Sequence, residues 1–427
     1  MENLIASKLS GGAPLIAAAA VSGLAGLVVT WLVAAVAGPV VYADFAVFWA
    51  LFFFMVSVLF GVQQEMARGV AAAGHTTGAT ASPWRRILAA TGVVAAIVLV
   101  VLVVLGPSTL GSSWVAWSIP ILVAVPCYVF VAAIQGALAG TDRWMDLALL
   151  LTIDAVLRLA FTGVALWLGG GATALGWATT LPILLTVAIG ILRGGPRLRS
   201  VRTDAVRARD FHWNTARAVF AGVGAAFFVA GFPAVLAVFA GSAAPEQFAT
   251  LVLVITLTRA PLLMPLSAIQ SLLVVRFTRL PAGRLIRAEL LVLGVLAAIG
   301  LAGAALGALI GPPLLTLLFG SEYVVTPGLV FVLVLGATAI AALYVTGPGT
   351  LARHLHTAYS LGWAFAAVIA VLCLALPLPL TLEDRAVLAL LVGPLCGVVI
   401  HLAAQSLSLR RAGATPQVPD DDRKESR

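Results

Sequence analysis

Long apolar segments separated by short polar turns fill almost the whole chain of 427 residues. A helix needs about 20 mostly apolar residues to cross the hydrocarbon core of a membrane. By that rule the sequence predicts twelve spans, six on each side of an arginine-rich segment. They lie near 13–37, 43–66, 86–106, 115–139, 144–168 and 171–192, and then near 214–240, 247–274, 286–310, 325–347, 357–379 and 386–408.

The composition excludes a soluble domain. Hydrophobic residues make up 62% of the chain and charged residues only 10%, whereas soluble domains have about 25% charged residues. Such a chain cannot cover a surface that faces water, so the sequence predicts an all-α polytopic membrane protein. The three cysteines (Cys127, Cys373 and Cys396) have no metal-binding spacing and suggest no disulfide framework.

Positive charges alternate from loop to loop. Arginines follow spans two, four, six, eight and ten and occur in the C-terminal tail, whereas the intervening loops carry almost none apart from Arg385. Because positive loops face the cytoplasm, we expect both termini to be cytoplasmic. The same topology accounts for the net charge of +8, so we expect no nucleic-acid partner.

The spans divide the chain into four parts. We expect an N-terminal six-helix half at 1–192, a basic cytoplasmic connector at 193–213, a C-terminal six-helix half at 214–412 and a polar cytoplasmic tail at 413–427. Because both halves start on the cytoplasmic side, they would be parallel repeats related by an axis along the membrane normal.

Charged residues inside predicted spans are the first candidates for chemistry. Asp154 and Arg158 are four residues apart and so share one helix face, while Arg259 has no acidic residue within one helical turn. A charge at the bilayer centre costs about 2.5–3.5 kcal/mol on insertion scales, so such residues face a bundle interior or a water-filled cavity. The pair either joins helices or places Arg158 on a cavity wall. Arg259 faces a cavity, pairs across helices or snorkels, and Arg217 either extends the cavity or anchors span seven.

Two further groups of residues have both a functional and a structural interpretation. Pro261 and Pro265 interrupt span eight and make it a candidate gate, or else a static kink. Gln63, Gln64 and Glu65 could line the inner mouth of a cavity or simply end span two.

Four glycines have the spacing that permits close packing of membrane helices. Gly136 and Gly140 are four residues apart in span four, and Gly303 and Gly307 have the same spacing in span nine. We expect them to serve helix packing and not ligand binding.

Four segments carry a resemblance to a known family. They are an aromatic-rich stretch in span two (YADFAVFWALF, 42–52), the hairpin of spans four and five (135–159), the sequence TRAPLLMPLSAIQ (258–270), and an outer turn with the span after it (LLFGSEYVVTPGLVFVLVLG, 317–336). Their order and spacing resemble the polysaccharide-exporter branch of the multidrug/oligosaccharidyl-lipid/polysaccharide (MOP) transporter superfamily, which includes the multidrug and toxic compound extrusion (MATE) transporters.

The resemblance implies two six-helix bundles in a V around a central cavity. It also implies that a polyprenyl-diphosphate-linked saccharide moves across the bacterial plasma membrane for cell-surface polysaccharide synthesis, by alternating access. In such flippases cavity cations attract the diphosphate, a role that would pass here to Arg158 and Arg259. The partners would be the lipid-linked saccharide, membrane lipids and other polysaccharide-assembly proteins. This chain departs from the pattern in having few other intramembrane cations.

Three other functions remain open. A cation-coupled small-molecule exporter of the MATE type needs a cavity carboxylate, for which Asp154 is the candidate. A membrane glycosyltransferase or polymerase would need a long outer loop carrying carboxylates, and none occurs. The sequence GALAGTDRW (136–144) resembles a motif of major facilitator transporters but joins spans four and five, where that family has it between spans two and three. No Walker phosphate loop or paired metal-binding histidines occur, so we expect no enzyme, cofactor or metal.

Overall fold

The computed structural model describes residues 2–73, 80–204, 219, 222–241, 243–377 and 379–414. The first-half helices are α1 (Glu2–Val58), α2 (Phe60–Ala73), α3 (Trp84–Thr109), α4 (Trp114–Gly140), α5 (Trp144–Trp167) and α6 (Ala172–Arg199). The second-half helices are α9 (Phe232–Val238), α10 (Pro245–Thr278), α11 (Ala282–Phe319), α12 (Pro327–Ala352), α13 (His356–Ala375) and α14 (Leu382–Ala414). The short elements are the 3-10 turn η1 (Gly111–Ser113), the π-helix η2 (Phe227–Gly231) and the strands β1 (Thr80–Ala81) and β2 (Thr203–Asp204).

The membrane-spanning helices match the apolar segments of the sequence. Within the described residues, ten helical stretches are long and apolar enough to cross a membrane. One of them, Pro14–Ala73, contains two of the predicted spans, and a shorter apolar helix, Gly222–Val238, corresponds to predicted span seven. The predicted all-α membrane fold is therefore confirmed.

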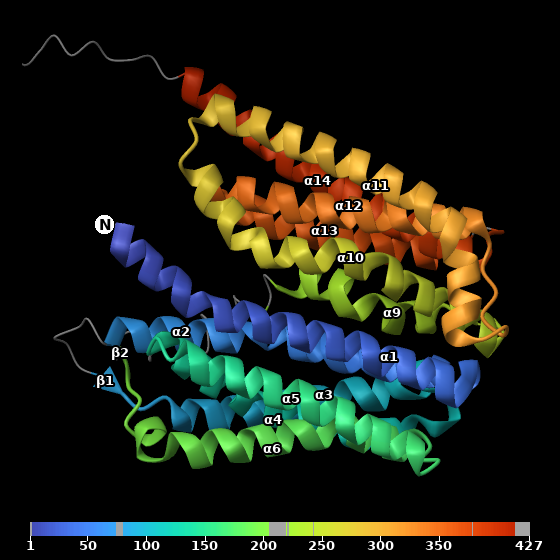
Figure 1. The fold of residues 1–427 in the computed structure, drawn as a ribbon. Helices are drawn as coiled ribbons and strands as arrows, with labels where there is room; N and C mark the ends of the chain where they lie inside the picture. The colour runs from blue at the N-terminus through green and yellow to red at the C-terminus, as the bar shows by residue number, and fades with distance from the viewer. Residues whose placement is uncertain are drawn as a thin grey trace, which may run out of the picture.

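The first two spans are joined by a break at one residue, where the sequence predicted an outer turn between 37 and 43. Gly38 alone leaves the helical region, with φ 78° and ψ 172°, a conformation that glycine adopts readily because it has no Cβ. Pro39 follows and has no N–H for the helical ladder. The chain reverses here, and the two arms of α1 lie side by side (Figure 1), with the Gly26 backbone against the Trp49 ring.

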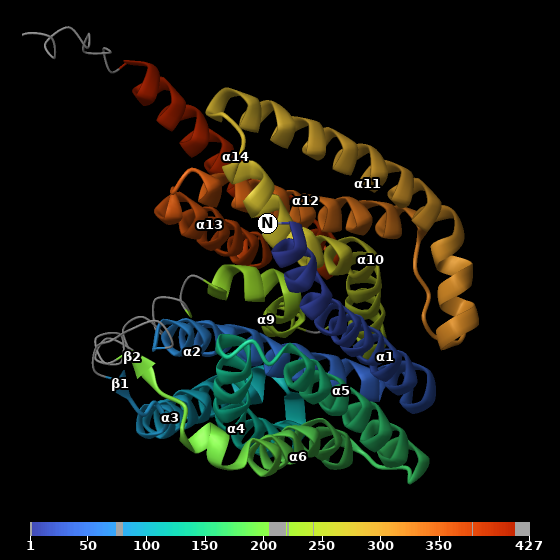
Figure 2. The same cartoon turned by 60° about the vertical axis from the view of Figure 1, so that its left-hand side comes forward.

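The helices form two groups that meet along α1 (Figures 1 and 2). In the first group α1 packs against α5, and α4 packs against α2, α3 and α6. In the second group α12 packs against α10, α11 and α14, and α13 packs against α14. Because α1 also contacts η2, α9 and α10, this helix forms much of the boundary between the groups.

The two glycine pairs differ in the packing they permit. A Cβ on Gly136 would collide with the backbone carbonyl of Gln63 on α2, and one on Gly140 would lie 2.7 Å from the carbonyl of Ala67. The first pair therefore lets α4 touch the α2 backbone, as its spacing predicted. A Cβ on Gly303 would lie 3.8 Å from Val334, which is an ordinary contact.

The predicted connector starts as a continuation of helix α6. Helix α6 continues past residue 192 to Arg199, so the first arginines of this segment are helical. Strand β2 then pairs antiparallel with β1 in the α2–α3 loop, with Thr80 opposite Asp204. The Thr203 hydroxyl also donates to the Ala81 carbonyl at 3.2 Å, so this part of the connector is attached to the first half.

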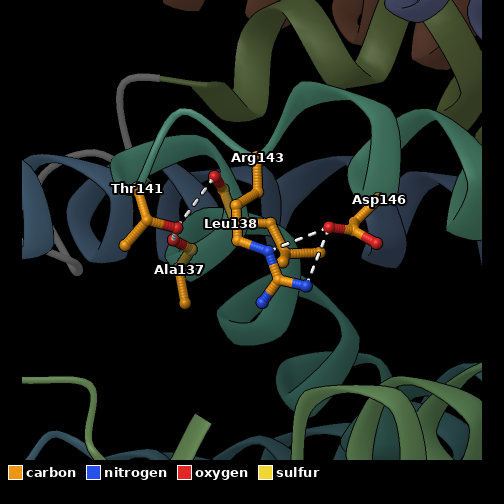
Figure 3. A network of polar contacts seen from close by, with 5 residues as sticks. All are labelled: Ala137, Leu138, Thr141, Arg143 and Asp146. Atoms are coloured by element: carbon orange, nitrogen blue, oxygen red, sulfur yellow. Dashed lines mark hydrogen bonds and ion pairs between the residues drawn. The ribbon is translucent and has the colours of Figure 1, made fainter. Parts of the chain in front are cut away.

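The α4–α5 turn is held by its own side chains (Figure 3). Arg143 donates through Nε to Asp146 Oδ2 at 2.9 Å, and its backbone N–H bonds the Leu138 carbonyl at 2.9 Å. The Thr141 hydroxyl donates to the Ala137 carbonyl at 2.8 Å. Asp146 lies in the first turn of α5, where a negative charge favours the helix dipole. Arg143, from the sequence GALAGTDRW (136–144), therefore stabilises a local turn with Asp146.

Candidate functional site

A cavity of about 420 Å³ lies at the boundary between the two helix groups. One wall comes from both arms of α1 and from α5, and the other from η2, α9 and α10. Its polar lining includes Asp154, Arg158 and Arg259 together with the hydroxyl groups of Ser22, Thr30, Tyr42, Ser57 and Thr256. Three residues that the sequence singled out on two helices, α5 and α10, therefore share one cavity.

Arg158 is buried against the aromatic face of α1. Its guanidinium carbon lies 4.9 Å from the Phe53 ring centroid, 5.9 Å from Phe52 and 6.0 Å from Trp49. Cation–π contacts of this kind contribute about 0.5–2 kcal/mol each. Its Nη2 donates to Asp154, while its Nη1 is buried without a hydrogen-bond partner. Asp154 thus orients Arg158 and leaves one donor nitrogen for another group.

Arg259 is held by a backbone carbonyl of the π-helix η2. Its Nη1 donates to the Phe228 carbonyl at 2.6 Å, and its Nε donates to the Ile255 carbonyl on its own helix at 3.1 Å. Its side chain is buried, with 6% exposed. The first bond crosses from α10 to η2, so Arg259 is fixed between two helices while it lines the cavity.

The π-helix explains why the Phe228 carbonyl is available. In an α-helix this carbonyl would accept from the Phe232 N–H, but that N–H bonds the Phe227 carbonyl instead. The next residue, Pro233, has no N–H to offer. A buried carbonyl left unpaired costs about 1–3 kcal/mol, and Arg259 supplies the missing donor.

The lining has a net positive charge. Asp154, Arg158 and Arg259 are the charged residues among those that line the cavity, so the lining carries two positive charges and one negative charge. The remaining surface is mostly apolar and includes the aromatic side chains of Tyr42, Phe45, Trp49 and Phe53. Such a cavity can bind an anionic group next to an amphipathic one.

The predicted inner-mouth residues lie elsewhere. Gln63, Gln64 and Glu65 are on α2 and are not among the residues that line the cavity. Glu65 is buried and forms an ion pair with Arg68 one turn away. The cluster lies inside α2 (Phe60–Ala73) and not at a helix end, and its role at an inner mouth stays a prediction.

The predicted gate residues lie in a continuous helix. The backbone of α10 is helical through Pro261 and Pro265, and Pro261 is exposed next to Ala260, which lines the cavity. The side chain of Pro265 and the whole of Arg217 lie outside the described residues. The gating role of the two prolines stays a prediction.

Sequence reasoning missed the partners of both arginines. It noted no role for Phe228 or Pro233, and it did not assign the aromatic side chains of α1 to Arg158. A partial signal exists in the sequence FFVAGFP (227–233), because a proline in the interior of a membrane helix removes the N–H that would bond a carbonyl of the preceding turn.

Two proteins of Mycobacterium tuberculosis are similar to this chain over most of its length. The uncharacterized protein Rv1510 is 35% identical over 384 residues, which cover 86% of this chain and 84% of that protein. The uncharacterized protein Rv3630 is 34% identical over 397 residues, which cover 91% and 90%. The chain belongs to the family of these two proteins. No family model matches it.

Comparison with solved structures shows which fold this member of the Rv1510/Rv3630 family has. The inward-facing conformation of a multidrug resistance MATE family transporter of the MOP superfamily matches with a TM-score of 0.68 and 15% identity, over 93% of this chain and 96% of that one. The outward-facing conformation of such a transporter matches with a TM-score of 0.60 and 15% identity, over 95% of each chain. The chain is thus a multi-pass membrane protein with the MOP transporter fold, as the sequence motifs implied.

Proposed function

We propose that this protein is a transporter that moves a polyprenyl-diphosphate-linked saccharide across the bacterial plasma membrane by alternating access. The observation that carries the proposal is the cavity whose lining includes Arg158 from one helix group, Arg259 from the other, and the single carboxylate Asp154. The lipid tail would stay in the bilayer while the head group crosses through the cavity.

The two arginines suit a diphosphate for different reasons. Arginine stays charged and can donate two parallel hydrogen bonds to phosphate oxygens. Arg158 offers its unpartnered Nη1, and Arg259 has five N–H groups, of which the bonds to Phe228 and Ile255 use two. Because Arg158 is oriented by Asp154 and Arg259 by a carbonyl, both are held in place before the ligand binds.

The rest of the lining suits a saccharide. Sugars have hydroxyl groups and apolar C–H faces, and the cavity has hydroxyl side chains beside the aromatic side chains of Tyr42 and Trp49. Thr30 and Thr256 donate to carbonyls of their own helices, and their oxygens can still accept from a ligand. These neutral groups would contact the sugar while the arginines contact the phosphates.

The proposal also covers the orientation of the protein in the membrane and the segments that move during transport. The halves at 1–192 and 214–412 would rock about the cavity, with both termini in the cytoplasm and Pro261 and Pro265 bending α10. Two bonds join the helix groups at the Gly38 end, from Tyr323 to Ala34 and from Trp31 to Leu318. They support a state that is closed on the outer side, in keeping with the higher TM-score for an inward-facing transporter. Polysaccharide-assembly proteins would supply the substrate and receive the product.

A cation-coupled small-molecule exporter is the second candidate. Asp154 favours it, because this residue is the acidic group of the lining and retains 22% side-chain exposure. A cation that bound Asp154 would compete with Arg158 for the carboxylate.

The flippase proposal can be tested with the full protein in liposomes that contain a fluorescent polyprenyl-diphosphate saccharide. Arg259→Ala and Arg259→Lys should both lose most of the flipping, because lysine keeps the charge and lacks the bidentate geometry. Arg284→Ala, which removes an exposed arginine outside the cavity, is the matched control and should flip normally. Normal flipping by Arg259→Ala would overturn the proposal.

A further inference from the structure

A second polar cluster lies within the second helix group, outside the cavity. At its centre Glu289 on α11 is fully buried, with 0% exposed. Its Oε1 accepts from Gln405 Nε2 on α14 at 3.2 Å, and the same amide nitrogen lies 3.2 Å from Thr350 Oγ1 on α12. The cluster therefore joins three helices, and none of these residues lines the cavity.

The hydrogen bonds fix the orientation of the Gln405 amide. Thr350 donates its hydroxyl hydrogen to the Thr346 carbonyl at 2.8 Å, so its oxygen can only accept from the amide. The Thr346 carbonyl also accepts from Gln405 Nε2 at 3.5 Å. With three acceptors around it, the amide nitrogen must point toward Glu289 and its oxygen away.

This orientation leaves the cluster short of donors. Glu289 Oε2 and Gln405 Oε1 are both buried without a hydrogen-bond partner. The carboxyl group also lies close against the α12 backbone, because a Cβ on Gly349 would be 2.7 Å from Oε1 and 2.8 Å from Oε2. An added proton on Oε2 would remove the charge and turn an unpartnered acceptor into a donor.

The charged and titratable groups around Glu289 do not neutralise it. Arg353, which follows the end of α12, interacts electrostatically with Glu289, and among the described ion pairs none joins the two residues. Burial lowers the pKa of Arg353, and the Glu289 carboxylate opposes that effect. Both ring nitrogens of His401 on α14 already have hydrogen-bond partners. Nδ1 bonds the Thr346 hydroxyl at 2.9 Å, and Nε2 bonds the Tyr359 carbonyl of α13 at 3.1 Å.

Two further arginines on α11 itself, Arg284 and Arg287, are exposed. At the other end of α11, near Gly38, Trp31 on α1 donates to the Leu318 carbonyl. A buried carboxylate with one neutral donor is costly in its charged form.

We propose that Glu289, with Gln405 and Thr350, forms a proton-binding site in the second half that is separate from the substrate cavity. The site lies near the start of α11, at the connector end of the bundle (Figure 1). When the proton is bound, α11, α12 and α14 share a neutral contact. When it leaves, the carboxylate attracts Arg353, whose Nη1 is itself buried without a partner. The proton therefore changes how these helices pack, whatever the cavity transports.

Infrared difference spectroscopy of the full protein in lipid nanodiscs tests the site directly. The unmodified protein should show the carbonyl band of a protonated carboxylic acid at mildly acidic pH, with the small downshift that D₂O produces. The band should disappear reversibly at alkaline pH. Glu289→Gln should lose this band, whereas Glu246→Gln, which changes an exposed carboxyl on α10, should keep it.

Glu289→Asp gives a second assignment that does not depend on losing the carboxyl group. It should retain a titrating band at a shifted frequency, because the acid group moves by one methylene. A native spectrum without a titrating carboxylic band would overturn the proposal. So would a band that persists unchanged in Glu289→Gln, since it would belong to another residue.

Discussion

Tyr323 donates a hydrogen bond from its hydroxyl to the Ala34 carbonyl at 3.0 Å, and this bond joins the turn after α11 to the first arm of α1. Ala34 lies in the last turn before the break at Gly38, where helix carbonyls lack partners of their own. The Tyr323 ring also meets Tyr42 edge-on, with 6.4 Å between centroids. The bond thus connects the two helix groups at the end where the cavity is proposed to be closed.

Tyr323→Phe should shift the protein toward an outward-open state. The variant keeps the ring contacts and loses a bond worth about 0.5–1.5 kcal/mol, so the ratio of the two states should change roughly two- to tenfold. The measurement is the labelling rate of a cysteine at Thr30, in a background without the three native cysteines, by an impermeant thiol reagent added outside. Tyr42→Phe keeps the Tyr323–Ala34 bond and is the matched control. Equal labelling of all three proteins would contradict the prediction.

Pro233→Ala and Arg259→Ala should be coupled in their effect on stability. Arg259→Ala leaves the Phe228 carbonyl without a donor and should lower the free energy of unfolding by about 1–3 kcal/mol. In a Pro233→Ala background the new N–H can bond this carbonyl, so the same substitution should cost less. Thermal unfolding of the four proteins in one detergent measures the coupling. Strictly additive losses would show that the carbonyl does not connect the two residues.

Gly136→Ala and Gly303→Ala should differ although their sequence motifs are alike. The first methyl group collides with the Gln63 carbonyl, and overpacking of this kind costs about 1–3 kcal/mol. The second meets nothing closer than Val334 at 3.8 Å and should leave the melting temperature unchanged or slightly higher. Melting curves of the two variants check this, and equal destabilisation would contradict the packing described for α2 and α4.

Asp154→Asn should separate the two candidate functions. The substitution removes the negative charge of the lining and leaves Arg158 against its aromatic neighbours. Flipping of the lipid-linked saccharide should persist within a few-fold, because the phosphate-binding cations remain. Resistance of host cells to cationic drugs is the second readout. Loss of drug resistance with intact flipping would favour the cation-coupled exporter.

The sequence predicts the spans well because their length is set by the thickness of the bilayer. The predicted outer turn between 37 and 43 is present, but the sequence did not show that a single positive φ at Gly38 makes it. The sequence also did not show that α6 continues to Arg199, inside the predicted connector.

The cavity was only partly predictable. Arg158 and Arg259 were found because a charge within a span is costly. Their partners were not, because the Phe228 carbonyl and the Phe53 ring come from other helices and carry no charge. Glu289 was missed because it follows Arg284 and Arg287 and so reads as part of a solvated helix end. Only the packing of α11 on α12 and α14 buries it.

The break at Gly38 also bears on how the protein is made. Residues 14–73 form one apolar helical stretch of 60 residues, with no polar loop between its arms. We therefore expect the two arms to insert together as a hairpin, because almost no hydrophilic residue at the turn has to cross the lipid. A residue at position 38 that disfavours a positive φ would favour one long straight helix. Only one of the two arms could then cross the bilayer as part of that helix.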